Sequence, residues 1–193
     1  SRLDALSAIE SIWEDNYGWG YDFGTDSSPL ASGYERVTAS TSYSSAQGYG
    51  WQSLSLGQRD RGTGTDLERD FLYGEDNTFL IDVFDGVHDL TIYWGETKYA
   101  HDQMGLYVEG SLIDTVDTAA GEVRAITYQV TVTDGQMTIR FADLGGGPNV
   151  AVTGLDVQLR APAVTASSPA AADIFGSVSS VSLTFSEPLP DGE

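Results

Sequence analysis

Two different spacings of hydrophobic residues occur near the start of the chain. Over residues 1–16, apolar side chains such as Leu6 and Ile9 recur every three or four positions, which predicts a short amphipathic helix. From Tyr17 the spacing changes to two, because aromatic residues alternate with Gly and Asp as far as Phe23. Such alternation places every second side chain on one face of a β-strand. We therefore expect a short N-terminal helical leader followed by the first strand of a β domain.

Further segments with the pattern of β-strands follow between residues 77 and 159. The predicted strands are 77–83, 90–94, 105–109, 124–132, 137–141 and 151–159. The dipeptides Asp85-Gly86, Glu109-Gly110 and Asp134-Gly135 tolerate positive φ in tight turns, which favours an antiparallel meander. About eight short strands in roughly 145 residues are typical of two packed sheets. The predicted fold class is therefore all-β, a jelly-roll β-sandwich.

The remaining segments set the predicted domain boundaries. Residues 25–67 are rich in Gly, Ser, Thr and Asp and predict long loops, which often carry binding residues. After Arg160 small residues dominate, and the one or two strands that fit there are too few to bury a core. We therefore divide the chain into a leader over 1–16, a β-sandwich over 17–161, and a linker with the start of a second module over 162–193.

Charge and composition exclude several classes of function. The chain has 29 Asp and Glu against 9 Lys and Arg, a formal net charge of −20. Because nucleic-acid binding requires clustered cations, no nucleic-acid partner is expected. No segment approaches the roughly 18 to 20 apolar residues of a spanning helix, so membrane insertion is not expected either. The absence of cysteine removes disulfides, thiolate metal sites and cysteine nucleophiles.

The sequence contains no motif that identifies a catalytic centre. No Gly-x-Ser-x-Gly turn accompanies His88 and His101, as a serine hydrolase would require. Any glycosidase-type carboxylate pair is easy to propose among 29 acidic residues and carries no information. The protein is therefore predicted not to be an enzyme, and a small polysaccharide-cleaving enzyme is the catalytic alternative.

Several short motifs, taken together, resemble a known module. They are Tyr21-Asp22-Phe23-Gly24, Ser28-Pro29, Gly33-Tyr34-Glu35-Arg36-Val37, Tyr43-Ser44, Gly48-Tyr49-Gly50-Trp51, Arg59-Asp60-Arg61-Gly62, Arg69-Asp70-Phe71 and Tyr99-Ala100-His101-Asp102. In this order they are similar, over about residues 20–160, to the galactose-binding-like domain found beside the catalytic domains of bacterial β-agarases and of rhamnogalacturonan acetylesterases. The resemblance implies a jelly-roll sandwich that attaches a secreted or cell-surface bacterial protein to a polysaccharide without catalysis.

The C-terminal segment carries a second resemblance. Residues 166–188 are similar to the opening of bacterial Ig-like modules of large surface proteins. This resemblance implies that other domains of a longer parent chain are partners of the β-sandwich.

Aromatic rings and charged groups provide the candidate binding site. Sugars place their C–H faces on aromatic rings and their hydroxyls on charged or amide partners. The predicted ligand-binding residues are Tyr49, Trp51, Arg59, Asp60, Arg61, Arg69, Tyr99, His101 and Asp102. The alternatives are structural: Trp51 in the core, the Arg and Asp neighbours as internal ion pairs, and His101 with Asp102 as hydrogen bonds that fix a loop.

Calcium is the metal that this composition suits best. It takes six to eight oxygen ligands, which acidic loops of a β-sandwich supply. By the resemblance, Asp22 and Asp156 lie near a structural Ca²⁺ that ties the two ends of the domain together. The alternative is that both are ordinary solvated carboxylates.

The net charge narrows the choice of polymer. A domain of charge −20 repels sulfated galactans and polygalacturonate unless calcium or the local arginines intervene. A neutral galactan such as agarose is therefore the first choice of partner, and a pectin-type polymer is the other. The alternative function is a structural or adhesive domain of a surface protein, stabilised by calcium and without affinity for glycans.

Overall fold

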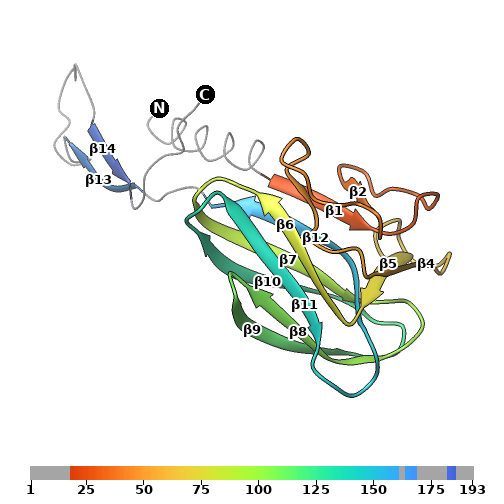
Figure 1. The fold of residues 1–193 in the computed structure, drawn as a ribbon. Helices are drawn as coiled ribbons and strands as arrows, with labels where there is room; N and C mark the ends of the chain where they lie inside the picture. The colour runs from red at the N-terminus through yellow and green to blue at the C-terminus, as the bar shows by residue number, and fades with distance from the viewer. Residues whose placement is uncertain (1–17, 161–163, 169–181, 186–193) are drawn as a thin grey trace.

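The structure, a computed structural model, describes residues 18–160, 164–168 and 182–185. Residues 18–160 form two β-sheets that pack face to face (Figure 1). The strands are β1 (Gly18–Phe23), β2 (Glu35–Val37), β3 (Tyr49–Trp51), β4 (Gly57–Asp60), β5 (Asp70–Gly74), β6 (Asp76–Asp82), β7 (Gly86–Gly95), β8 (His101–Val108), β9 (Ser111–Thr118), β10 (Val123–Val132), β11 (Gln136–Asp143) and β12 (Val150–Leu159). This confirms the all-β sandwich. The predicted helical leader, 1–16, lies outside the described residues.

β12 organises the larger of the two sheets. The order of this seven-stranded sheet is β10-β7-β12-β1-β2, and β5 also pairs with β12 and carries β4. β7 pairs along one edge of β12, whereas β1 and β5 share the other edge. The second sheet has five strands in the order β3-β6-β11-β8-β9.

The connections differ from the predicted meander. Glu109-Gly110 forms the tight turn between β8 and β9, which lie in one sheet, and both residues have positive φ. Asp85-Gly86 and Asp134-Gly135 instead lead from one sheet to the other, because β6 and β11 belong to the five-stranded sheet and β7 and β10 do not. The meander prediction is therefore wrong at these two turns, where the chain crosses the sandwich.

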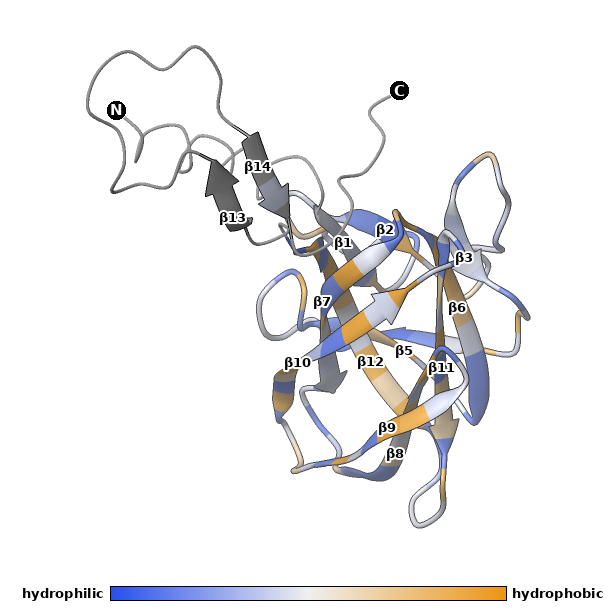
Figure 2. Ribbon diagram, turned by 90° about the vertical axis from the view of Figure 1, so that its left-hand side faces the viewer, coloured by the Kyte–Doolittle hydropathy of each residue, from blue (hydrophilic) through white to orange (hydrophobic). Residues whose placement is uncertain are grey.

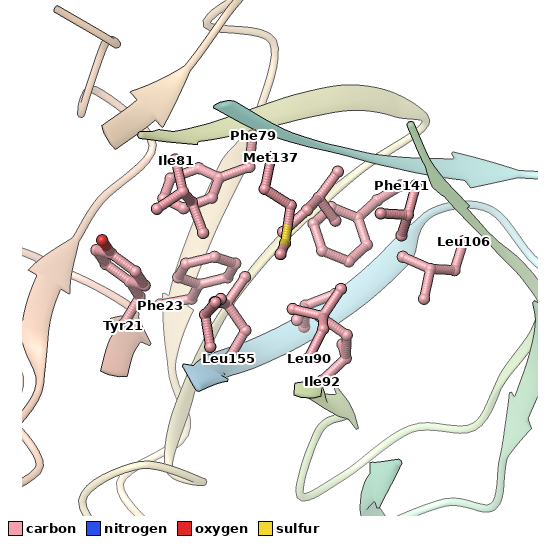
Figure 3. Close-up of a cluster of buried hydrophobic side chains, with 14 of the residues drawn as sticks. Tyr21, Phe23, Phe79, Ile81, Leu90, Ile92, Leu106, Met137, Phe141 and Leu155 are labelled. Atoms are coloured by element: carbon pink, nitrogen blue, oxygen red, sulfur yellow. The ribbon is translucent and has the colours of Figure 1, made fainter. Parts of the chain in front are cut away.

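The core lies between the sheets and follows from alternation along the strands. On β7 the side chains of Leu90, Ile92 and Trp94 are fully buried, and the residues between them are partly exposed. Trp94 is therefore a core residue. Figure 3 shows β7 and β12 side chains meeting those of the opposite sheet, such as Phe79 and Phe141. In Figure 2, hydrophobic and hydrophilic residues accordingly mix along the strands.

The C-terminal segment contains one β-hairpin in its described part. β13 (Val164–Ser168) and β14 (Ser182–Phe185) pair in antiparallel fashion. Two strands agree with the one or two expected after Arg160. The Ig-like nature of this segment stays a prediction. No helix in the described ranges is long and apolar enough to cross a membrane.

Candidate functional site

A pocket of about 380 Å³ opens where β4 and β5 meet the β7–β8 connection and the loop before β12. It is lined by Arg59, Arg61, Phe71, Tyr73, Glu96, Lys98, Tyr99, His101 and Asn149. We call it the Arg61 pocket. In Figure 1 its strands β4 and β5 lie beside the β12 end that pairs with β5. The pocket therefore joins the edge of the seven-stranded sheet to segments distant in sequence.

Arg61 is held rigidly in this pocket. Its Nε donates to Glu96 Oε2 at 3.0 Å and its Nη2 donates to Glu96 Oε1 at 2.9 Å, a bidentate ion pair. The guanidinium carbon lies 5.2 Å from the ring centre of Phe71 and 5.1 Å from that of Tyr99. Bidentate pairing and cation–π contact both restrict its orientation. Arg61 is therefore a fixed group of the pocket.

Glu96 is a buried carboxylate with a complete set of donors. Besides Arg61, the backbone N–H groups of Lys98 and Tyr99 donate to its oxygens at 2.8 Å and 2.9 Å. Burial alone would raise the pKa of Glu96, but the hydrogen bonds from Arg61 and from these N–H groups outweigh it and hold the pKa below its usual range. Glu96 is thus ionised and anchors the β7–β8 connection.

His101 and Asp102 connect the pocket to the loop before β12. His101 Nδ1 lies 3.2 Å from the carbonyl oxygen of Asn149, and Nε2 lies 4.0 Å from Glu96 Oε1 without a hydrogen bond. Asp102 Oδ1 accepts a hydrogen bond from the Gly147 N–H at 2.6 Å. The loop-fixing alternative holds for Asp102, whereas His101 also lines the pocket.

Three side chains at the mouth of the pocket are open to solvent. Tyr99 is 53% exposed, and Arg59 and Lys98 are exposed. The Lys98 Nζ lies 5.0 Å from the Tyr99 ring centre. Neither Arg59 nor Lys98 has an ion pair within the described residues. The mouth thus offers an aromatic ring and two cations to a ligand.

The structure brings four of the predicted ligand-binding residues together: Arg59, Arg61, Tyr99 and His101 line the pocket. Asp60 and Arg69 form a separate bidentate ion pair with distances of 3.1 Å and 2.9 Å. The Arg69 side chain lowers the pKa of Asp60. Because side chains alternate along a strand, Asp60 points away from the face shared by Arg59 and Arg61. The internal ion pair is the interpretation that fits Asp60 and Arg69.

Trp51 and Tyr49 are not part of the pocket. Trp51 is only 2% exposed and lies in the core, with ring centres 4.9 Å from Phe79 and 5.3 Å from Phe23. Tyr49 packs on Tyr21 at 4.8 Å. The prediction that these rings stack on a sugar is therefore wrong for Trp51, because its faces are covered by other aromatic rings. Tyr49 is half-buried beside the same cluster.

Five residues of the pocket were missed by the sequence reasoning: Phe71, Tyr73, Glu96, Lys98 and Asn149. Spacing by two could have linked Phe71 with Tyr73 on one face of a strand. Glu96 and Lys98 lie in or next to a connection, where no periodicity reveals the direction of a side chain. Their role depends on a contact with Arg61, which is 35 residues from Glu96.

A second polar site lies at the end of β1. Asp22 and Asp70 are buried, at 2% and 0% exposure. Oδ2 of Asp22 accepts from the Ala31 N–H at 2.8 Å, and Oδ2 of Asp70 accepts from the Thr25 N–H at 3.1 Å and from Ser28 Oγ. The Oδ1 atoms of both aspartates accept no hydrogen bond in the described chain.

Burial dominates the electrostatics of this pair. It raises the pKa of Asp22 to about 6, with a further contribution from Asp70, and it also raises the pKa of Asp70. Gly24 leaves room for this carboxylate, because a Cβ at this position would collide with Asp70 Oδ2 and displace it. Two unpaired, buried carboxylate oxygens match the preference of Ca²⁺ for oxygen ligands. The described residues contain no cluster of three or more His, Cys, Asp or Glu, so backbone carbonyls would complete the set.

Asp156 does not join this site. Its Oδ2 accepts from the Tyr93 hydroxyl at 2.7 Å. The charged groups that shift the pKa of Asp22 are Asp70, Arg36 and Asp66, and Asp156 is not among them. The two predicted metal ligands, Asp22 and Asp156, therefore have separate partners, and Asp70 is the carboxylate beside Asp22.

The fold is a β-sandwich of two sheets, and comparison with known families identifies its class as galactose-binding-like. Residues 19–158 match the model of a family described as Beta-agarase/YXIM esterase-like, galactose-binding domain-like. The match covers more than half of the chain. The chain belongs to this family.

Two curated relatives are similar to the same part of the chain. Beta-agarase A of Zobellia galactanivorans is 32% identical over 139 residues, which are 69% of this chain and 25% of the relative. The uncharacterized esterase YxiM of Bacillus subtilis is 27% identical over 144 residues, 72% of this chain and 36% of the relative. The chain thus spans between a quarter and about a third of these proteins.

Solved structures show the same fold at lower sequence identity. The crystal structure of the B. subtilis YxiM protein superposes with a TM-score of 0.61 at 22% identity, covering 74% of this chain and 40% of that one. A Bacteroides uniformis β-glucuronidase gives a TM-score of 0.58 at 14% identity, with 76% and 18% covered. At these identities the likeness concerns the fold.

Proposed function

We propose that this domain is a non-catalytic carbohydrate-binding module that attaches a secreted or cell-surface bacterial protein to a polysaccharide through the Arg61 pocket. The observation that carries the proposal is the exposed Tyr99 ring beside the fixed Arg61–Glu96 pair. A sugar ring placed on Tyr99 has its hydroxyls within the range of a guanidinium and of His101. This combination of an aromatic face with rigid polar partners is typical of sugar sites.

The chemistry of Glu96 supports a role in binding rather than catalysis. A glycosidase of the usual type uses two carboxyl groups about 5 to 9.5 Å apart, one of them as a general acid. Glu96 is the only carboxylate among the described residues that line the pocket. Its lowered pKa and its bidentate bond to Arg61 suit a structural anion and not a proton donor.

A galactan is the polymer that we propose to test first. Beta-agarase A is among the relatives, which favours a galactan of the agarose type. Pectin-type polymers are the second choice. Affinity for a few sugar units is expected in the range of about micromolar to millimolar, because hydroxyls exchange water for protein with little net gain. Other domains of a longer parent chain would add avidity.

Affinity electrophoresis tests this proposal. The migration of the domain is measured in native gels with and without agarose and other polysaccharides. Tyr99→Ala is expected to abolish retardation in the gel that retards the wild type, because it removes the ring that a sugar would cover. Tyr107→Ala is the matched control, since Tyr107 also contacts an arginine, Arg140, at 4.6 Å but lies outside the pocket. Equal retardation of wild type and Tyr99→Ala would refute the assignment of this pocket.

A second candidate function is a calcium-stabilised structural or adhesive domain without glycan binding. The buried Oδ1 atoms of Asp22 and Asp70, which lack hydrogen-bond partners among the described residues, favour it. We propose that these two aspartates hold a structural Ca²⁺, together with nearby backbone carbonyls. A cation would remove the mutual repulsion of two carboxylates that are out of contact with water.

Thermal unfolding with added Ca²⁺ or with a chelator tests the calcium proposal. Ca²⁺ at about 100 times its dissociation constant is expected to stabilise the wild type by about 2.7 kcal/mol. Asp22→Asn should remove this response, whereas Asp156→Asn, whose position bonds to Tyr93, should keep it. If Asp156→Asn also loses the response to Ca²⁺, the ion would lie between Asp22 and Asp156, the pair predicted from the sequence. An unfolding temperature that chelator leaves unchanged would refute the calcium proposal.

A further inference from the structure

The Arg61 pocket is basic although the protein is strongly acidic. Among the described residues that line it, three are Lys or Arg and one is acidic, in a chain that has 9 Lys and Arg and 29 Asp and Glu in all. Because Glu96 pairs with Arg61, these two charges cancel inside the pocket. Arg59 and Lys98 remain as two net positive charges. The local charge of the pocket therefore has the opposite sign to that of the whole chain.

Four of the eight described Lys and Arg side chains have no carboxylate partner, and two of these four, Arg59 and Lys98, line the same pocket. Arg69, Arg140 and Arg160 each form an ion pair with an aspartate, and Arg36 donates to the carbonyl oxygens of Thr25 and Ser28. Arg124 on β10 has neither an ion pair with a carboxylate nor a hydrogen bond to a carbonyl oxygen within the described residues. With so many acidic residues available, two unpaired cations in one pocket are best explained by a ligand that supplies the negative charge.

Because salt screens distant charges, the charge of the pocket determines which ligand binds, and the net charge of the chain does not. At physiological ionic strength exposed charges interact over a Debye length of about 8 Å, so acidic side chains farther away are largely screened. Arg59 and Lys98 line the same pocket and therefore act on a bound group at short range. A guanidinium matches the planar arrangement of two oxygens in a carboxylate, and an ammonium acts as a point charge beside it.

We propose that the Arg61 pocket binds a sugar unit that carries an anionic group, a carboxylate or a sulfate ester, with Arg59 and Lys98 as the partners of that group. Tyr99 supports the sugar ring, and the Arg61–Glu96 pair fixes the floor. The inference rests on the proposed carbohydrate-binding function and changes the substrate class within it, from a neutral galactan to a polymer with acidic units. Uronic acids and sulfated galactose share the required chemistry.

The test compares three polymers in affinity electrophoresis: neutral agarose, a sulfated galactan and polygalacturonate. We expect the wild type to bind one or both anionic polymers more tightly than agarose, and to lose this preference as NaCl is raised from 20 to about 300 mM. The double variant Arg59→Gln/Lys98→Gln should weaken binding to the preferred anionic polymer about tenfold, because it removes two exposed charge contacts. Whether sulfate or carboxylate is preferred identifies the source of the charge.

Controls separate this inference from the proposed function. Arg124→Gln removes an unpaired cation outside the pocket and should leave binding unchanged. The two exposed side chains of the double variant do not contribute to the core, and an unchanged unfolding temperature will verify this. Equal binding to neutral and anionic polymers, or no effect of the double variant, would overturn the anionic specificity while leaving carbohydrate binding intact. If neither the wild type nor Tyr99→Ala binds any of the polymers, the proposed function itself would be overturned.

Discussion

The two buried carboxylate sites of this domain balance charge in opposite ways. At the Arg61 pocket, Glu96 is fully buried, yet hydrogen bonds from Arg61 and the backbone keep its pKa low. At the end of β1, burial raises the pKa of Asp22 to about 6, because no cationic side chain donates to it. Both carboxylates are almost completely inaccessible to solvent, so the difference between their pKa shifts comes from their hydrogen-bond partners. A buried carboxylate is either neutralised by its own chain or left to attract a cation or a proton.

The largest expected loss of stability comes from breaking the Arg61–Glu96 ion pair. Arg61→Met leaves Glu96 buried without a counter-charge and is expected to lower the free energy of unfolding by about 3 to 5 kcal/mol. Urea denaturation measures this. The double variant Arg61→Met/Glu96→Gln should recover part of the loss, since it removes the unpaired charge and its single amide oxygen can still accept from one of the two backbone N–H groups, that of Lys98 or that of Tyr99. A single variant as stable as the wild type would contradict the importance of the pair.

The pH dependence of stability sharpens the comparison with a smaller effect. The pKa of Asp22 is about 6 in the folded state against 3.8 in a model compound, so the folded state binds the proton more tightly. The free energy of unfolding of the metal-free domain should therefore fall as the pH rises from about 4 to about 6, by about 3 kcal/mol from this group.

The control for this pH effect is Asp22→Asn. It should reduce the fall in stability between pH 4.5 and pH 7.5 in the presence of chelator, because an amide does not titrate. Glu96 acts with the opposite sign: its pKa is lowered, so its contribution is present above the ordinary glutamate pKa of 4.5 and is lost as the pH falls below it. Identical pH profiles for wild type and Asp22→Asn would show that Asp22 is not the titrating group.

The smallest effect is expected at an ion pair near the surface. Asp60 and Arg69 bond in the same bidentate way as Glu96 and Arg61, but their side chains are 28% and 24% exposed. Asp60→Asn should therefore change the free energy of unfolding by less than about 1 kcal/mol and leave sugar binding intact. Denaturant unfolding at low and high salt measures it. A loss as large as that of Arg61→Met would mean that burial does not separate the two pairs.

Sequence periodicity predicted β6 and β7 because they alternate clearly between core and solvent, whereas β12, which is buried at most positions, was predicted from its apolar content. It missed the short strands β2, β3, β4 and β5, which have three to five residues each, and β9, where Leu112 and Ile113 are exposed on an edge strand. Short strands and edge strands bury too few side chains to produce a readable pattern. Their pairing is fixed by distant partners instead.

The candidate site was predicted only in part, because the sequence shows which residue types are present but not which of them are buried. Arg59, Arg61, Tyr99 and His101 could be selected because their residue types suit sugars. Burial could not be deduced in the same way: Trp51 has the right chemistry and is covered by Phe23 and Phe79. The partners of buried charges were equally hidden, since Asp22 and Asp70 are 48 residues apart and meet only through the folded sheets.

The position of β12 has a consequence for biosynthesis. It is the last strand of the sandwich along the chain, and it pairs with β1, β5 and β7. Until Val150–Leu159 leaves the ribosome, β1 and β5 lack their partner along one edge, so the sandwich closes only when nearly all of it has been translated. Such late pairing between distant segments slows folding and prolongs the exposure of strand edges. Nascent chains halted before Val150 are therefore expected to need chaperones, and chains released after Leu159 are not.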